Sequence, residues 1–338
     1  MSHLNLSAGV GTGASLKIIS PGTLSLLQDA GRFGMTALGL TQGGPLDAHS
    51  FAWANALVGN PPNSTVIEHS IGGLVLQATT ACTVAVTGAE LRPQLNGKPV
   101  ACWQALTLKA GDELELGYMT RGLRAYLAVS GGIAAPLQFG SSATVMREGI
   151  GGLAQDGCKL QANDLLPLGQ AAELALATTT ATPTAAIQQL TLPPADQAQP
   201  LQLRLLPGYQ AASFSPTEQA RFFLNPYQVT ASCDRMGYKL SGSAIHCTSR
   251  TLLSEGISLG AVQIPPDGQP IVLLNDRQTL GGYPKIGAVL SLDCWKLGQA
   301  APGSLVQFSA IDSYQAHNAL CLYQASMAPY STRLARSL

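Results

Sequence analysis

The sequence predicts a mainly β protein with a few helices, and three observations support this prediction. Residues 201–208, LQLRLLPG, place apolar side chains at every second position, which is the pattern of a half-buried strand. Residues 106–117, LTLKAGDELELG, indicate two short strands around a tight Ala-Gly turn. Residues 160–169, LQANDLLPLG, match LKAGDELELG at six of ten positions, and APGSLVQF at 301–308 is a looser echo. We therefore expect one kind of hairpin to recur.

One segment, residues 43–62, predicts a clear helix with the sequence GGPLDAHSFAWANALVGNPP. Pro45 suits the first helical turn, and Asp47 places a carboxylate near the positive end of the helix dipole. Gly59 can adopt the left-handed conformation that ends a helix, and the prolines that follow prevent its continuation. The expected packing stripe consists of Leu46, Ser50, Trp53 and Leu57.

Changes in composition along the 338 residues divide the chain into two folded parts. Residues 169–200 are rich in Ala, Thr, Gln and Pro, which predicts a linker with room for one short helix. We expect a flexible leader at 1–15, a β-rich domain at 16–168, a second domain at 201–312 and a C-terminal tail or helix at 313–338.

Composition argues against several classes of function. The formal net charge is zero and 11% of residues are charged, so a nucleic-acid-binding face is not expected. No apolar run approaches the ~20 residues of a membrane span, and a signal-peptide pattern is lacking, so a cytoplasmic protein without membrane contact is expected. The seven cysteines have no C-x-x-C spacing and the five histidines no H-x-x-x-H pair, so no metal site is predicted.

The densest group of polar residues lies in residues 258–293. The apolar runs IVLLN and IGAVLSL predict two core strands, IPPDGQP predicts a turn, and the amides of GGYPK could form an anion-binding nest. Arg277 could grip a carboxylate or phosphate with two hydrogen bonds, and Asp276, Tyr283 or Lys285 could move a proton. The alternative is an ion pair of Asp276 with Arg277 or Lys285 that holds a loop.

Three other stretches add charged candidates. They contain Asp29, Arg32 and Asp47 in residues 20–47, Asp234 and Arg235 in 232–242, and Glu255 in 252–263. The structural alternatives are a solvent-exposed salt bridge between Asp29 and Arg32 and ordinary charges at strand ends.

Together these motifs resemble one family over residues 16–312. SPGTLSLLQDAGRFGMTALGLTQGGPLD, SCDRMGYKLSG and PPDGQPIVLLNDRQTLGGYPKI are similar to the biotin-dependent carboxyltransferase, or allophanate hydrolase subunit 2, family. The resemblance implies a cyclophilin-like β-barrel for the C-terminal part and a β-rich N-terminal part. It also implies a subunit-1 (B-type) partner and, in the 5-oxoprolinase members, a further barrel-type partner of the A type.

The implied reaction opens 5-oxoproline to glutamate with ATP, although the sequence contains no G-x-x-x-x-G-K-[ST] phosphate loop. Two alternatives remain open: the carboxyltransferase half of a urea or amide carboxylase that uses carboxybiotin, and a non-catalytic regulatory module that binds a kinase-inhibitor-like partner. The expected catalytic residues are Asp276, Arg277, Gln278, Tyr283 and Lys285. The expected substrate-binding residues are Asp29, Arg32, Asp47, Asp234, Arg235, Glu255, Gln263, Gly281 and Gly282.

Overall fold

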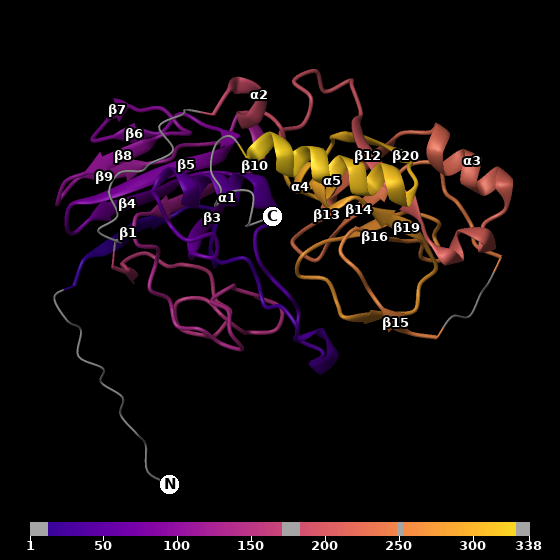
Figure 1. Cartoon of the computed structure of the whole chain (residues 1–338), viewed down its shortest axis with the longest axis horizontal. Coiled ribbons are helices and arrows are strands. Elements are labelled where there is room, and N and C mark those ends of the chain that lie inside the picture. Colours follow the sequence, from indigo (N-terminus) through magenta and orange to yellow (C-terminus); the bar gives the residue numbers. More distant parts are fainter. Residues whose placement is uncertain (1–12, 171–182, 249–252, 329–338) are drawn as a thin grey trace, which may run out of the picture.

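Two β-rich halves lie side by side in the computed structural model, which describes residues 13–170, 183–248 and 253–328 (Figure 1). The N-terminal half contains two sheets, and the C-terminal half contains a closed barrel. The prediction of a mainly β fold is therefore confirmed. Most of the predicted leader, residues 171–182 of the predicted linker and the last ten residues of the predicted tail lie outside the described residues.

The N-terminal half is a sandwich whose two sheets share one core. The six-stranded sheet has the order β11 (Leu165–Pro167), β1 (Ser15–Pro21), β4 (Leu74–Ala78), β9 (Glu113–Glu115), β6 (Gln94–Leu95) and β7 (Lys98–Pro99). The five-stranded sheet has the order β2 (Leu24–Gln28), β3 (Val66–Ser70), β10 (Arg121–Val129), β5 (Cys82–Glu90) and β8 (Ala105–Leu108). Alternate apolar residues of both sheets, such as Leu16, Leu76 and Leu127, fill the space between them.

The predicted hairpin at 106–117 is wrong, because its two strands belong to different sheets. Strand β8 pairs with β5, whereas β9 pairs with β4 and β6. The repeated sequence instead encodes a repeated turn. A carboxylate oxygen of Asp112 accepts a hydrogen bond from the backbone N–H of Lys109 at 2.7 Å, and Asp164 does the same for Gln161 at 2.7 Å. The residue before each aspartate has positive φ in both turns.

The C-terminal half is a closed barrel. Its strand order is β12 (Leu201–Pro207), β19 (Lys285–Val289), β16 (Ala261–Gln263), β17 (Ile271–Leu273), β14 (Gly237–Ser241), β13 (Tyr227–Cys233) and β20 (Leu305–Ala310). The alternation predicted for 201–208 is observed, since Leu201, Leu203 and Leu205 point into the barrel core. A two-stranded ribbon, β15 (Glu255–Gly256) and β18 (Leu280–Gly281), projects from one end (Figure 1).

Helix α1 (Ala48–Leu57) confirms the predicted helix with a later start. Asp47 is its N-cap and accepts a hydrogen bond from the backbone N–H of Ser50 at 3.1 Å, so Pro45 precedes the helix. The other helical elements are η1 (Thr36–Leu38), α2 (Ala185–Gln188), η2 (Tyr209–Ser213), α3 (Pro216–Leu224), α4 (Ser291–Gly298) and α5 (Ser313–Met327). The predicted strand IGAVLSL is shorter than expected because β19 ends at Val289 and α4 begins two residues later.

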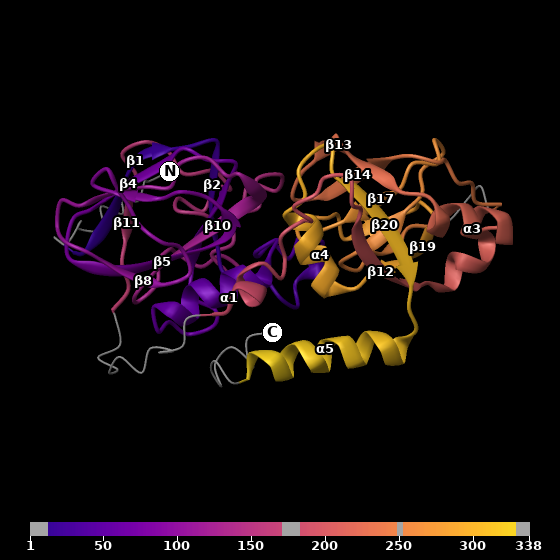
Figure 2. The ribbon, with the colours of Figure 1, turned by 90° about the horizontal axis from the view of Figure 1, so that it is seen from above.

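Helix α5 returns from the barrel and lies against the helical layer of the N-terminal half (Figure 2). The hydroxyl of Tyr323 is 2.6 Å from Nδ1 of His49 in α1, and Met327 is buried. These residues share an apolar cluster with Trp53 and Leu292, from both halves. The two halves therefore share a packed junction.

Candidate functional site

A polar cluster lies at the rim of the barrel, where the ribbon meets η2 and the start of β19. The carboxylate of Glu255 forms an ion pair with Nζ of Lys285 and accepts a hydrogen bond from the hydroxyl of Tyr209. Gln210 links these groups, because Nε2 donates to Glu255 at 2.7 Å and Oε1 accepts from the backbone N–H of Lys285 at 2.7 Å. We call Tyr209, Gln210, Glu255 and Lys285 the rim cluster.

The hydrogen bonds fix the charge states in the rim cluster. Hydrogen bonds from Lys285 and Tyr209 lower the pKa of Glu255, and the bond to Glu255 raises the pKa of Tyr209. Glu255 is therefore an anion and Tyr209 a neutral donor at neutral pH. With three donors already on its carboxylate, Glu255 is better suited to hold the Lys285 ammonium in place than to accept a proton. Tyr209 and Gln210 carried no sequence motif and were not predicted.

Arg277 is a buried cation beside this cluster. Its Nε donates to the carbonyl of Ile257 at 3.1 Å and its Nη1 to the carbonyl of Leu274 at 3.1 Å. Among the described residues, no carboxylate lies within 4.0 Å of its guanidinium. Burial lowers the pKa of Arg277. Nζ of Lys285 donates to the neighbouring carbonyl of Gly256 at 3.3 Å, so the two cations bind adjacent peptide groups of one segment.

The glycine pair does not form the expected anion-binding nest. Gly281 lies in β18 and pairs with Glu255, and neither Gly281 nor Gly282 has positive φ in the described backbone. An extended backbone directs successive N–H groups to opposite sides, whereas a nest needs them to converge. Tyr283 is exposed at the rim and Gln278 is half-buried.

Gln263 lies beneath the ribbon. Its side chain is 1% exposed, and Nε2 has no hydrogen-bond partner within the described part of the chain. In the sheet, Gln263 is the register partner of Lys285. The structure thus brings Gln263, Gly281, Lys285 and Glu255 together at one end of the barrel.

Asp276 does not pair with Arg277 or Lys285, and its partner is Arg235. Nε and Nη2 of Arg235 donate to the two carboxylate oxygens of Asp276, each at 2.9 Å. Nη1 of Arg235 forms an ion pair with Glu68 in β3 of the sandwich. Because all three residues are buried, this network joins the two halves from within. We call Glu68, Arg235 and Asp276 the junction network.

Glu68 was not predicted, because the strand VIEHS contains no motif that marks a site. The hydroxyl of Tyr126 donates to its Oε2 at 2.8 Å, and Arg124 lies 3.8 Å from its Oε1. Burial opposes the charge of Glu68, but Arg235 and Arg124 outweigh this effect, so its pKa is lowered. Glu68 therefore remains an anion inside the junction.

Asp29 and Arg32 are buried, so a solvent-exposed salt bridge between them is wrong. Oδ1 of Asp29 accepts a hydrogen bond from the hydroxyl of Ser141 at 2.6 Å. Arg32 donates to the carbonyls of Gln138 and Ala143, both at 3.0 Å. In the described residues both side chains thus close loops of the sandwich.

The remaining two aspartates also bind the chain itself. Asp47 accepts hydrogen bonds from Thr191 at 2.7 Å and from Nε2 of Gln299 at 2.8 Å, in addition to capping α1. Asp234 is exposed and closes a turn by accepting from the backbone N–H of Met236 at 2.8 Å. The structure therefore separates these residues from the rim cluster.

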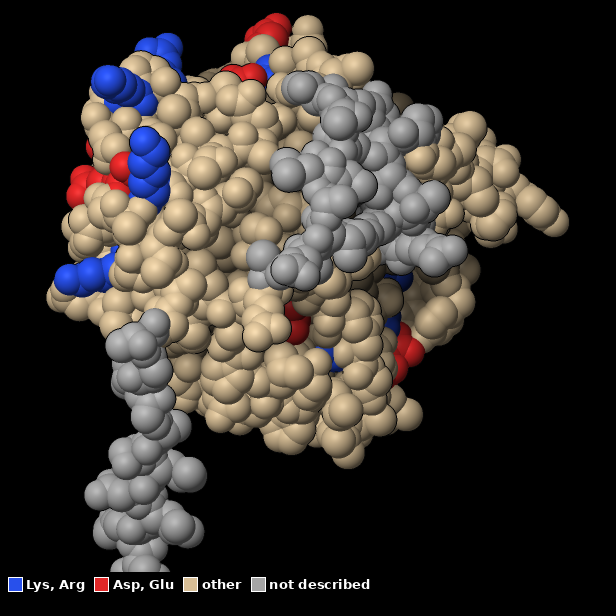
Figure 3. All heavy atoms as spheres, turned by 60° about the vertical axis from the view of Figure 1, so that its left-hand side comes forward, with Lys and Arg blue, Asp and Glu red and all other residues tan. Residues whose placement is uncertain are grey.

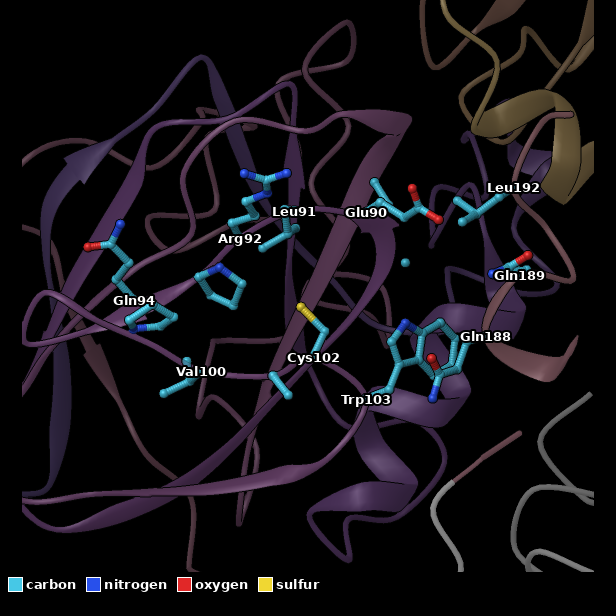
Figure 4. A pocket seen from close by; sticks show the side chains of 15 residues that line it. Glu90, Leu91, Arg92, Gln94, Val100, Cys102, Trp103, Gln188, Gln189 and Leu192 are labelled. Atoms are coloured by element: carbon cyan, nitrogen blue, oxygen red, sulfur yellow. The ribbon is translucent and has the colours of Figure 1, made fainter. Parts of the chain in front are cut away.

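Two hollows lie at the other side of the sandwich, and none of the predicted site residues lines either of them. The first, of about 490 Å³, has Glu90 and Arg92 along one wall and Cys102 and Trp103 along the other (Figure 4). The second, of about 580 Å³, lies between the start of β10, the segment 193–199 and barrel residues 301–305. Neither hollow brings Arg277, Lys285 or Gln263 to its surface.

The described residues contain no group of three or more His, Cys, Asp or Glu side chains arranged to hold a metal ion. No helix in the same residues is long and apolar enough to cross a membrane. Charged side chains are sparse on the face shown in Figure 3, where Lys and Arg gather only at one edge of the sandwich.

Comparison with known proteins shows the family. The family model "Carboxyltransferase domain, subdomain A and B" matches residues 38–310. The chain is 37% identical over 294 residues to the C subunit of 5-oxoprolinase from Escherichia coli, covering 87% of this chain and 90% of that protein. It is 33% identical to the corresponding 5-oxoprolinase protein of Haemophilus influenzae, covering 89% of this chain and 93% of that protein.

A solved structure agrees with the sequence comparison. The crystal structure of the K. lactis urea amidolyase superimposes with a TM-score of 0.82 at 28% identity over 93% of this chain. The chain spans only 20% of that amidolyase. The matched residues include the whole rim cluster and junction network. The chain therefore belongs to the carboxyltransferase subdomain A and B family, the allophanate hydrolase subunit 2 family that its motifs indicated.

Proposed function

We propose that the chain is the C-type component of an ATP-dependent 5-oxoprolinase that opens 5-oxoproline to glutamate. The observation that carries the proposal is the match to the E. coli 5-oxoprolinase protein over 90% of its length. By contrast, the match to the urea amidolyase of Saccharomyces cerevisiae occupies 17% of that enzyme. The name of the E. coli relative, one subunit of several, supports activity in a complex with a B-type partner and a barrel-type A partner.

The rim cluster and Arg277 supply the binding groups that this reaction needs. A lactam is a poor electrophile, and its ring opening places negative charge on the carbonyl oxygen in the transition state. Cationic donors fixed near that oxygen stabilise this charge. Lys285 is held by Glu255, and Arg277 has no carboxylate partner in the described residues, so both suit an anionic substrate.

The other predicted catalytic residues take different parts in the proposal. Tyr283 and Gln278 lie in the same segment as Arg277 and are placed at the edge of the site. Both oxygens of Asp276 are already occupied by Arg235. We therefore assign Asp276 to holding the end of β17 in position and not to proton transfer.

The rim does not fit a nucleoside triphosphate. A triphosphate carries several negative charges and is bound by convergent backbone amides or several cations. The rim offers Arg277 and Lys285, and Glu255 neutralises one of these charges. It therefore suits one carboxylate, and we place ATP binding on a partner protein of the complex.

The carboxyltransferase half of a urea or amide carboxylase is the second candidate. It is supported by the TM-score of 0.82 to the K. lactis urea amidolyase. The same donors could stabilise the oxyanion of a urea or of carboxybiotin.

Reconstitution decides between these functions. The chain is mixed with its A-type and B-type partners, and glutamate is measured from 5-oxoproline with ATP. We expect turnover that depends on this chain and is lost in Lys285→Ala. The matched control is Lys239→Ala, because Lys239 forms a separate ion pair with Asp267 on the same barrel. Carboxylation of urea without turnover of 5-oxoproline would support the second candidate, and a tight but inactive complex would support a regulatory module.

A further inference from the structure

The unpartnered side chain of Gln263 carries a further inference. The carboxamide is 1% exposed, and its Nε2 has no partner among the described residues. It lies at the edge of a small apolar cluster outside the barrel core, formed by Ile257, Ala261 and Leu273. A buried polar group that makes no hydrogen bond destabilises a fold, so its presence calls for a reason such as a ligand.

The strand above Gln263 can explain why the group is covered. A methyl group on Gly281 of β18 would lie 2.7 Å from Nε2 of Gln263, so the bare glycine backbone rests directly on the carboxamide. Strand β15 is anchored by Glu255 and by the carbonyls that Lys285 and Arg277 bind. Strand β18 pairs with β15 through only two residues, and its Leu280 is exposed.

We propose that Gln263 recognises the amide edge of the substrate once β18 moves outward. A carboxamide presents one N–H donor and one C=O acceptor on the same edge. The amide of a small lactam ring presents the complementary pair, so Nε2 donates to the lactam oxygen and Oε1 accepts from the lactam N–H. This inference rests on the proposed function, because it assumes that an amide substrate binds at this rim.

The neighbouring cations extend the recognised class. Lys285 is the register partner of Gln263, and both Lys285 and Arg277 bind the segment that covers it. A ligand with an amide edge and a carboxylate can satisfy the carboxamide and one cation together. A carboxylate-bearing lactam meets both conditions, whereas urea offers only the amide edge. The site is therefore specific for a lactam acid.

The test compares ligands with and without the amide N–H. Binding to the reconstituted complex is measured by titration calorimetry for 5-oxoproline and for N-methyl-5-oxoproline. Gln263→Met should weaken 5-oxoproline about tenfold to a hundredfold, because two hydrogen bonds are lost, but should change N-methyl-5-oxoproline less than about threefold. The matched control is Gln202→Met, an exposed glutamine on strand β12.

Stability provides the second measurement. Since Nε2 of Gln263 makes no hydrogen bond within the described residues, Gln263→Met should not lower the melting temperature. An equal loss of affinity for both lactams, unchanged affinity for 5-oxoproline, or a Gln263→Met chain that fails to fold would overturn the proposal.

A failure of the proposed function gives a different result. If the wild-type complex does not bind 5-oxoproline, the same variants are titrated with urea and N,N′-dimethylurea. Loss of urea binding alone in Gln263→Met would then retain an amide-reading carboxamide while rejecting the lactam substrate. Failure of the wild-type complex to bind any of these amides would overturn both proposals.

Discussion

Replacing Arg235 by methionine tests whether the junction network holds the two halves together. The change removes two hydrogen bonds of 2.9 Å to Asp276, the ion pair with Glu68 and a hydrogen bond of 2.6 Å to the carbonyl of Gly44. Both carboxylates remain buried without this guanidinium. Breaking a buried ion pair by removal of one partner costs about 3–5 kcal/mol.

The expected effect can be narrowed from the structure. Glu68 keeps a second cation, because Arg124 lies 3.8 Å away, whereas Arg235 is the only ion-pair partner of Asp276 in the described residues. We therefore expect a loss of about 4 kcal/mol, in the middle of that range. For a domain of comparable size this corresponds to a fall in melting temperature of roughly 8–16 °C.

Thermal unfolding followed by circular dichroism measures the effect. The matched control is Lys239→Met, which breaks the exposed ion pair with Asp267 and should cost at most about 1 kcal/mol. Asp276→Asn added to Arg235→Met should recover part of the loss, because a neutral amide is easier to bury than a carboxylate. The reasoning is refuted if Arg235→Met melts no lower than Lys239→Met.

Three further predictions concern the ribbon, Arg277 and a buried histidine. Gly281→Ala should lower stability by about 1–3 kcal/mol, since the new methyl group would lie 2.5 Å from Cδ1 of Ile257, whereas Gly256→Ala meets nothing within 4 Å; equal melting temperatures would contradict this. Arg277→Lys should reduce both turnover and thermal stability, because the guanidinium binds two buried carbonyls and the ammonium cannot reproduce that geometry; unchanged stability would place Arg277 outside the packed segment. Burial lowers the pKa of His69 to about 4, so between pH 6.5 and 4 the unfolded chain binds more protons than the folded chain. Stability should fall across that window as the pH falls, by up to about 3 kcal/mol, and His69→Gln should show a shallower slope in urea unfolding than a variant of the exposed His246; parallel slopes would contradict it.

Local signals in the sequence were sufficient for much of the fold. The alternation in residues 201–208 identified a strand that faces the barrel core with Leu201, Leu203 and Leu205. The glycine and prolines after residue 58 correctly ended helix α1. The repeated Ala-Gly-Asp and Ala-Asn-Asp sequences encode the same turn, because the aspartate closes it within four residues. Each of these features depends on neighbours in the chain, so each can be read from short segments.

Partner choice could not be read in the same way. The strands on either side of one such turn enter different sheets, because the turn sets only the direction of the chain and not the strand that receives it. Arg235 pairs with Asp276 and Glu68 instead of the acid beside it in sequence, across 41 and 167 residues. Motifs therefore determined the family and the segment that carries the site.

The tertiary structure decided which charges within that segment are free. Asp276 is occupied inside the junction, Lys285 is held by Glu255, and Arg277 and Gln263 lack a carboxylate or hydrogen-bond partner, respectively, among the described side chains. Burial and pairing depend on groups that folding brings together from distant parts of the chain. A charge that looks reactive in sequence can thus be neutralised by a residue that no local pattern places beside it.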